Sequence, residues 1–341
     1  MTAAGFVLIE QDLPLAPLFD RFEAALRERG LPVRRGPAVQ VAQGLTEQGR
    51  EGLEILIASP RGRIDATTMQ ALACLHTIVL PTTGIEAVAL ADATTHGIAV
   101  ANGGTAENAI SLAEATALLI LSLCYRLPRM LMGALAAATS IAGDVPEATM
   151  LRGRTVGLVG YGAIAQALAP RLQVFEASVL VRSGRHGLSA PGVQFVALNE
   201  LLERSDFVCV LGALNAATRH LIGRVELGRM KRSAYLVNTA RGALVDETAL
   251  ADALRAGELA GAALDVFERE PLPPDSPLRA LPNVILTPHR LGHTREARAS
   301  FLPAMIDNVE AARAGRLPPR CKNPEVLAHW RRLSRAGARP A

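Results

Sequence analysis

The chain has 341 residues, which is enough for two ordinary domains with sizeable hydrophobic cores. Half of its residues are hydrophobic and a fifth are charged, so the composition excludes a disordered protein. The net charge of +4 is small for this length, and the basic residues form no long patch with interleaved aromatic residues, so we expect no nucleic-acid partner.

The cysteines and the apolar stretches indicate the compartment. The four cysteines lie far apart without the CxxC spacing of zinc sites, so we expect no metal site and a reduced, cytoplasmic location. They are Cys74, Cys124, Cys209 and Cys321.

The first residues lack the basic leader of a signal peptide, and the longest apolar stretch, 115–125, is too short to cross a bilayer, so no membrane partner is expected. The basic tail is interpreted as a solvated terminus: it contains Arg331, Arg332, Arg335 and Arg339.

The amino-terminal part alternates short β-branched runs with longer helical patterns. The predicted strands are 6–9, 54–58, 77–80 and 97–101. The predicted helices between them include 15–29 and 66–75. Alternation of this kind predicts a parallel sheet covered by helices on both faces.

A long apolar helix, predicted over about 106–126, separates this part from a second series of strands. Those strands are 155–159, 178–181, 207–211, 234–238, 262–266 and 284–287. One helix is predicted at 247–258, and a last one, around 294–314, is expected to return to the first domain. The chain therefore predicts an α/β fold of two doubly wound parallel-sheet domains, Rossmann-like or flavodoxin-like, with a cleft between them.

The run TVGLVGYGAIAQAL predicts a strand, a tight turn and a helix. Gly160 and Gly162 take the first two glycine places of a GxGxxG motif, and Ala165 takes the third, where a small side chain suffices. The helix amino-terminus at Ala163 and Ile164 then offers free N–H groups to the phosphates of a dinucleotide. The alternative is a plain tight turn.

The second strand of this series bears on the choice of dinucleotide. It ends SVLVRSGRH, so that Ser183, flanked by Arg182 and Arg185, stands where an acidic residue binds the ribose hydroxyls of NAD. Two guanidinium groups without a carboxylate favour a 2′-phosphate, so we predict NADP as the preferred cofactor, with NAD possible. Alternatively, both arginines are solvated surface residues.

Three polar residues follow β-branched runs in the second half of the chain. Arg241 closes AYLVNTAR, Glu270 lies in DVFEREPLP, and His289 ends NVILTPH. Ligands of open α/β sheets bind beyond the carboxyl ends of the strands, so these side chains are expected to converge on one small anionic substrate. Taken singly, each has a structural alternative: a strand-edge cap, a solvated loop residue and a histidine in a turn.

These segments resemble the D-isomer-specific 2-hydroxyacid dehydrogenases. The resemblance runs from the first strand to about Asn323 and is carried by NGGTAENAISLAEA, VGLVGYGAIAQAL, VNTARGALVDETAL, AGAALDVFEREPLPPDSPL and LPNVILTPH. It implies a substrate domain of residues 1–103 with 293–341 and a dinucleotide-binding domain of 104–292. It also implies a homodimer formed through the helix at 106–126 and the apolar stretch 127–148 after it.

The resemblance implies roles for individual residues. His289 would protonate the carbonyl oxygen of a small 2-oxo acid, Glu270 would support the imidazolium, and Arg241 would bind the substrate carboxylate. Cofactor contacts would come from Asp265, Thr239 and Ala240. Substrate contacts would come from Thr82, Thr83, Gly84 and Asn108, for which a β-turn and a helix start are equally simple alternatives.

The chain departs from the family pattern at two places. Ala213 stands where the family has a proline beside the cofactor, and Arg290 with Leu291 follows His289 where small or apolar residues are usual. Arg290 either adds a cation for an acidic substrate or points to solvent.

The expected function is an NADP-preferring reductase of glyoxylate-like or hydroxypyruvate-like acids, giving D-2-hydroxy acids. The alternative is an NAD(P)-sensing, corepressor-like protein of the same fold without significant turnover.

Overall fold

The computed structural model describes residues 5–36, 52–128, 130 and 147–330. It divides into two compact units, one of Met1–Thr105 with Arg295–Ala341 and one of Ala106–Thr294. The basic tail and most of the stretch 127–148, to which a role in dimerisation was assigned, lie outside the described residues.

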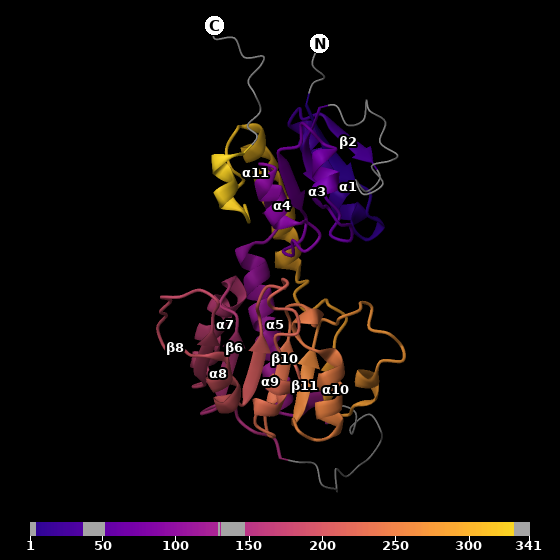
Figure 1. Cartoon of the computed structure of the whole chain (residues 1–341). Coiled ribbons are helices and arrows are strands. Elements are labelled where there is room, and N and C mark those ends of the chain that lie inside the picture. The colour runs from indigo at the N-terminus through magenta and orange to yellow at the C-terminus, as the bar shows by residue number, and fades with distance from the viewer. Residues whose placement is uncertain (1–4, 37–51, 129, 131–146, 331–341) are drawn as a thin grey trace. The chain divides into compact units, whose positions relative to one another are not determined.

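Unit 1 is built on a five-stranded parallel sheet (Figure 1). The strand order is β2-β1-β3-β4-β5, and the strands are β1 (Phe6–Glu10), β2 (Val33–Gly36), β3 (Leu53–Ile57), β4 (Thr77–Leu80) and β5 (Ala99–Asn102). Its helices are α1 (Ala16–Glu28), α3 (Ala66–Gln70), α4 (Leu90–Thr95) and α11 (Arg295–Arg313). Short 3-10 turns lie at η1 (Leu13–Leu15) and η5 (Pro324–Ala328).

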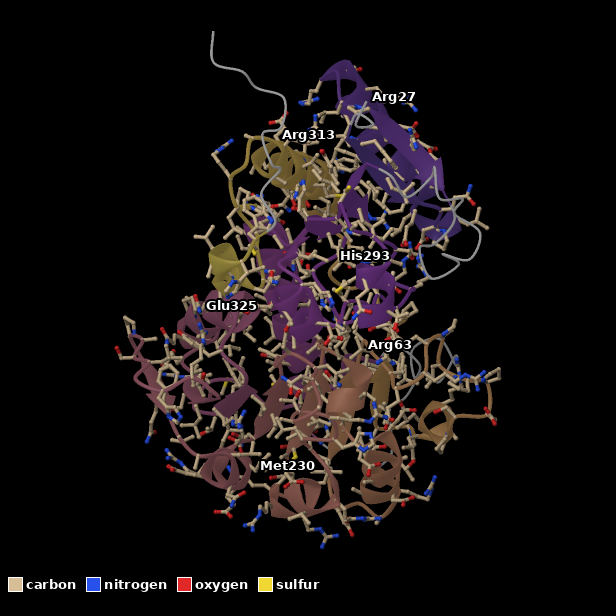
Figure 2. All side chains as sticks on the ribbon, turned by 45° about the horizontal axis from the view of Figure 1, so that its top comes forward. Arg27, Arg63, Met230, His293, Arg313 and Glu325 are labelled. Atoms are coloured by element: carbon tan, nitrogen blue, oxygen red, sulfur yellow. The ribbon has the colours of Figure 1, made fainter. Side chains whose placement is uncertain are left out.

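Both faces of this sheet are covered, which explains why its inner strands, β1, β3 and β4, are largely apolar. Phe6 and Leu8 pack with Met69 of α3, whereas Val7 and Ile9, on the opposite face, pack with α1 and α11. Charged residues fix the outer helices at the edges of this core. Arg27 of α1 donates to the Val33 carbonyl of β2, and Arg313 of α11 pairs with Glu54 of β3 (both arginines are labelled in Figure 2).

Unit 2 carries a seven-stranded parallel sheet of order β12-β11-β10-β9-β6-β7-β8. The strands are β6 (Thr155–Val159), β7 (Ser178–Arg182), β8 (Val193–Phe195), β9 (Phe207–Val210), β10 (Tyr235–Asn238), β11 (Gly261–Leu264) and β12 (Val284–Leu286). The helices are α5 (Ala106–Cys124), α7 (Ala163–Val174), α8 (Leu198–Arg204), α9 (Arg224–Arg229) and α10 (Glu247–Arg255). Short 3-10 turns lie at η3 (Gly242–Leu244) and η4 (Pro277–Ala280). The strand order reverses at β6, as in dinucleotide-binding folds.

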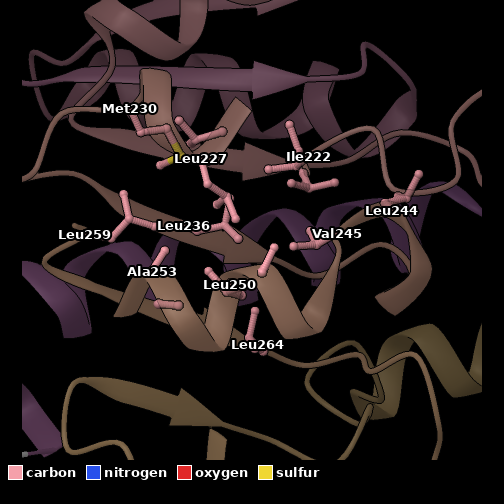
Figure 3. Close-up of a cluster of buried hydrophobic side chains, with 14 of the residues drawn as sticks. Ile222, Leu227, Met230, Leu236, Leu244, Val245, Leu250, Ala253, Leu259 and Leu264 are labelled. Atoms are coloured by element: carbon pink, nitrogen blue, oxygen red, sulfur yellow. The ribbon is translucent and has the colours of Figure 1, made fainter. Parts of the chain in front are cut away.

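The helices of unit 2 also cover both faces of its sheet. On one face, Leu227 of α9 and Leu250 of α10 pack on Leu236 and Leu264 of the central strands (Figure 3). On the other face, α5 and α7 belong to a second core cluster, which includes Val237 of β10 and Ala263 of β11. The prediction of two doubly wound parallel-sheet domains is therefore confirmed for each unit.

Helix α5 is long and apolar enough, by length and composition alone, to cross a membrane, with a mean hydropathy of 1.4. More than half of it, 56%, is buried within the structure. Ala113, Ile120 and Leu123 of this helix belong to the core cluster formed with α7 and the sheet. Packing in this core accounts for the apolar residues on the buried side of α5, whereas Ile110 and Leu118 of the same helix are exposed.

Candidate functional site

The structure brings Arg241, Glu270 and His289 to one edge of the sheet in unit 2. They follow β10, β11 and β12, which are neighbouring parallel strands, so their carboxyl ends share that edge. Nδ1 of His289 lies 2.7 Å from Oε2 of Glu270. The charge of Arg241 acts on the same carboxylate. That the three side chains meet on one small anionic substrate stays a prediction.

Glu270 is held as a carboxylate by its neighbours. Partial burial alone would raise the pKa of Glu270, but hydrogen bonds with His289 and the Phe267 N–H, together with the positive charges of His289 and Arg241, lower that pKa below its ordinary value. The Phe267 N–H donates to Oε1 over 3.1 Å, which leaves Oε2 for the imidazole. An ionised acceptor at Nδ1 requires the proton on that nitrogen, so Nε2 is the ring nitrogen available to a substrate.

His289 has an unusual backbone for a residue with a side chain. Its φ is +54°, and its N–H donates to the Thr287 carbonyl over 3.0 Å, so the chain turns sharply at Pro288. The side chain of His289 is 43% exposed, and that of Glu270 is 36% exposed. The pair is therefore open to a small molecule while its orientation is fixed by the turn.

Arg241 is positioned by a residue that sequence reasoning missed. The buried amide of Asn238, at the end of β10, accepts from the Ala240 N–H at 3.1 Å and donates to the Arg241 carbonyl at 2.9 Å. The guanidinium also donates to the Ala240 carbonyl. A polar residue that ends an otherwise apolar strand, as in AYLVN, was the available signal.

The glycine turn has the geometry expected of a dinucleotide-binding loop. Gly160 has a φ of +113°, and a Cβ atom there would lie 2.7 Å from the Gly212 nitrogen. A Cβ atom on Gly162 would meet nothing within 4 Å, so the backbone there is open to a ligand. The first helical hydrogen bond of α7 runs from Gln166 to Gly162, which leaves the amides of Ala163 and Ile164 without a partner inside the helix.

Arg185 approaches this turn from the end of β7. Its guanidinium donates to the Tyr161 carbonyl at 2.6 Å, and its N–H donates to the Ser183 hydroxyl at 3.0 Å. Arg182, the last residue of β7, accepts from the Gly160 N–H through its carbonyl. These three predicted cofactor residues therefore lie beside the glycine turn.

The remaining predicted residues fall into both units. In unit 2, the Thr239 hydroxyl pairs with that of Thr116 of α5 at 2.9 Å, and Asn108 is buried in the first turn of α5. In unit 1, Thr82, Thr83 and Gly84 follow β4 in a bend, where Asn102 donates to the Thr83 carbonyl. That these unit 1 residues meet Arg241 stays a prediction.

Asp265 is almost fully buried, with 1% exposure. Its Oδ1 accepts from the Thr287 hydroxyl at 2.7 Å and from the Arg290 N–H at 3.1 Å, and its Oδ2 lies 3.4 Å from the Leu291 nitrogen. The carboxylate thus contacts the segments before and after His289. Sequence reasoning assigned this residue to the cofactor and missed these contacts.

The chain is similar in sequence to a known protein family and to several known enzymes. Residues 118–290 match the family model described as D-isomer specific 2-hydroxyacid dehydrogenase, NAD binding domain. A glyoxylate reductase of Thermofilum pendens is 39% identical over 287 residues, which cover 78% of this chain and 80% of that protein. The glyoxylate/hydroxypyruvate reductase B of Pectobacterium carotovorum is 44% identical over 178 residues, so the match spans 51% of this chain and about half of that protein, 56%.

A solved structure agrees over nearly the whole chain. The NADPH-dependent glyoxylate/hydroxypyruvate reductase of Sinorhizobium meliloti, in complex with NADP and malonate, is similar with a TM-score of 0.80 and 27% identity. The similarity covers 95% of this chain and 98% of that chain.

Proposed function

The chain belongs to the family of D-isomer-specific 2-hydroxyacid dehydrogenases, which are NAD(P)-dependent oxidoreductases acting on the CH–OH group, and from this premise we propose that it reduces small 2-oxo acids. The substrates we propose are glyoxylate, hydroxypyruvate and acids of similar size, and the products are D-2-hydroxy acids. The observation that carries the proposal is the 2.7 Å contact between His289 and Glu270 beside Arg241. The names of the relatives support the same substrate class.

The proton in this reaction comes from His289. With Glu270 ionised and bound at Nδ1, the imidazolium is stabilised and Nε2 carries the proton to the carbonyl oxygen. The partly exposed ring then recovers a proton from solvent. Glu270 keeps its charge throughout, since its role is to stabilise and orient the imidazolium.

Arg241 binds the carboxylate of the 2-oxo acid. A guanidinium group forms charge-assisted hydrogen bonds with a carboxylate and polarises a neighbouring carbonyl group. Asn238 fixes the backbone of Arg241, and this restraint supports a precise placement of the cation.

The cofactor we propose is NADPH, bound at the glycine turn. The open backbone at Gly162 and the free amides of α7 fit a pyrophosphate, and the guanidinium groups of Arg182 and Arg185 fit a 2′-phosphate. When bound, NADPH supplies the hydride that reduces the carbonyl carbon. This chemistry requires no metal ion.

The test is turnover of the purified protein with NADPH and a panel of 2-oxo acids that includes glyoxylate and hydroxypyruvate. Oxidation of NADPH is expected with at least one small acid, and hydroxypyruvate is expected to give D-glycerate. His289→Ala should abolish turnover without weakening NADPH binding, whereas the neighbouring His293→Ala serves as the control. Binding of NADPH without turnover of any acid would contradict the proposal and favour a dinucleotide sensor.

We further propose that the chain forms a homodimer and works in the cytoplasm. Exposed apolar side chains gather where α5 and α7 end, and there Tyr125, Met150, Val174 and Phe175 line one hollow that a second copy would cover. Sedimentation at several protein concentrations tests the dimer, with Val174→Glu expected to yield monomers. The four cysteines are free thiols, which suits a reducing compartment.

A further inference from the structure

Asp265 is a buried carboxyl group that needs hydrogen bonds. It follows β11, its side chain is shielded from water, and a polar group in such a place is costly to leave without partners. All three hydrogen bonds that the structure gives this carboxyl group come from residues 287–291. The hydrogen-bonding needs of Asp265 are therefore met mainly by the segment that carries His289.

This segment contains a strained residue. A left-handed φ, such as the +54° of His289, is strained in a residue with a side chain and persists only where the surroundings enforce it. Thr287 on one side of His289 and Arg290 on the other bind the same oxygen of Asp265. The carboxylate thus fixes both ends of the turn, and the imidazole that projects from its middle is held against Glu270.

We infer that Asp265 is a positioning residue, which holds the turn around His289 so that the imidazole stays aligned with Glu270. The inference rests on the proposed function, in which His289 is the proton donor. It goes beyond the cofactor role that the family resemblance implies for Asp265. A carboxylate has about four lone-pair positions, and three are already directed to this turn.

The hydroxyl of Thr287 allows the inference to be tested without altering Asp265. Thr287→Val removes the 2.7 Å hydrogen bond but keeps the size and β-branching of the side chain, whereas Thr287→Ser keeps the hydroxyl. If the turn positions the imidazole, Thr287→Val lowers kcat about tenfold, and Thr287→Ser restores most of it. The dissociation constant of NADPH stays at its wild-type value in both variants. Asp265→Asn is expected to lower kcat further.

Two measurements need no turnover and separate this inference from the proposed function. In Thr287→Val, the amides of Arg290 and Leu291 should exchange with solvent faster than in the wild type. The downfield proton resonance of the His289 Nδ1–H should broaden or vanish, and Thr287→Ser should retain both wild-type signatures. A wild type that reduces no 2-oxo acid defeats the proposed function yet leaves these readouts intact.

The inference is overturned if Thr287→Val keeps the wild-type kcat, amide exchange and imidazole resonance. It is also overturned if Asp265→Asn weakens NADPH binding while Thr287→Val leaves kcat unchanged, because Asp265 would then act only as a ligand of the cofactor. Should Asp265→Asn fail to fold, the pair of Thr287 variants still decides the question.

Discussion

Gly242 lies so close to the backbone of Phe267 that a Cβ atom on Gly242 would sit 1.8 Å from the Phe267 carbonyl carbon. Gly242 follows Arg241, and the Phe267 N–H binds Glu270. The loop that carries Arg241 is therefore in close backbone contact with the loop that carries Glu270. A side chain at residue 242 would force these loops apart.

Gly242→Ala is expected to impair both stability and turnover. Overpacking against backbone atoms should cost about 3 kcal/mol in the free energy of unfolding, and kcat/KM should fall more than tenfold because Arg241 and Glu270 separate. Thermal unfolding and steady-state kinetics measure the two effects. Gly228→Ala is the matched control, since a Cβ atom there meets nothing within 4 Å and the residue lies in α9. Equal thermal stability and equal kcat/KM in Gly242→Ala and Gly228→Ala would contradict this prediction.

Glu270→Gln is expected to lower the rate by weakening the support of the imidazole. The amide keeps the shape of the side chain but removes the negative charge that faces Nδ1 of His289. At neutral pH, kcat/KM should drop about 100-fold. A wild-type kcat/KM in Glu270→Gln would mean that Glu270 does not act through the imidazole.

Much of the fold was predictable because burial on both faces of a parallel sheet leaves apolar runs in the sequence. The missed strands were β2 and β8, which lie at sheet edges. β2 has the sequence VRRG, with two arginines, and β8 contains only three residues. Such edge strands form by pairing with a neighbour that is already in place, so their own sequences carry little signal. Helix α3 ends at Gln70, earlier than the predicted residue 75.

The three proposed catalytic residues could be named from the sequence, but the contacts that hold them in place could not. Strand ends and family motifs identified Arg241, Glu270 and His289. The partners of Asn238 and the contacts of Asp265 with the His289 turn depend on which strands lie side by side, which local sequence does not state. A buried polar residue at the end of an apolar strand indicates only that some partner exists.

Arg185→Ser tests the preference for NADPH. Loss of a charge-assisted bond to the 2′-phosphate should raise the KM for NADPH about tenfold and leave the KM for NADH unchanged. The ratio of the KM for NADPH to the KM for NADH is the critical readout, because Arg185 also donates to the Tyr161 carbonyl of the glycine turn. A change that affects both cofactors equally would show that Arg185 acts through the turn. Arg229→Ser, on α9, is the control and should leave the ratio unaltered.

His76 makes the stability of unit 1 depend on pH. It is 2% exposed, and burial, together with the nearby charge of Arg313, lowers the pKa of His76 from 6.5 to about 4. The unfolded chain therefore takes up a proton below pH 6.5, whereas the folded state stays neutral until about pH 4. The contribution of His76 to stability is complete above pH 6.5 and is lost as the pH falls toward 4, by about 3 kcal/mol in all.

His76→Gln should flatten this dependence, because the amide cannot take up a proton. The only tryptophan, Trp330, donates to the His76 carbonyl and lies edge-on to the imidazole, so its fluorescence reports on this part of the core. Urea unfolding followed by that signal at several pH values between 7 and 4 gives the slope for each variant. His329→Gln, at an exposed position, should keep the wild-type slope. A wild type whose urea midpoint does not fall between pH 6.5 and 4 would mean that the His76 imidazole is protonated within the folded core.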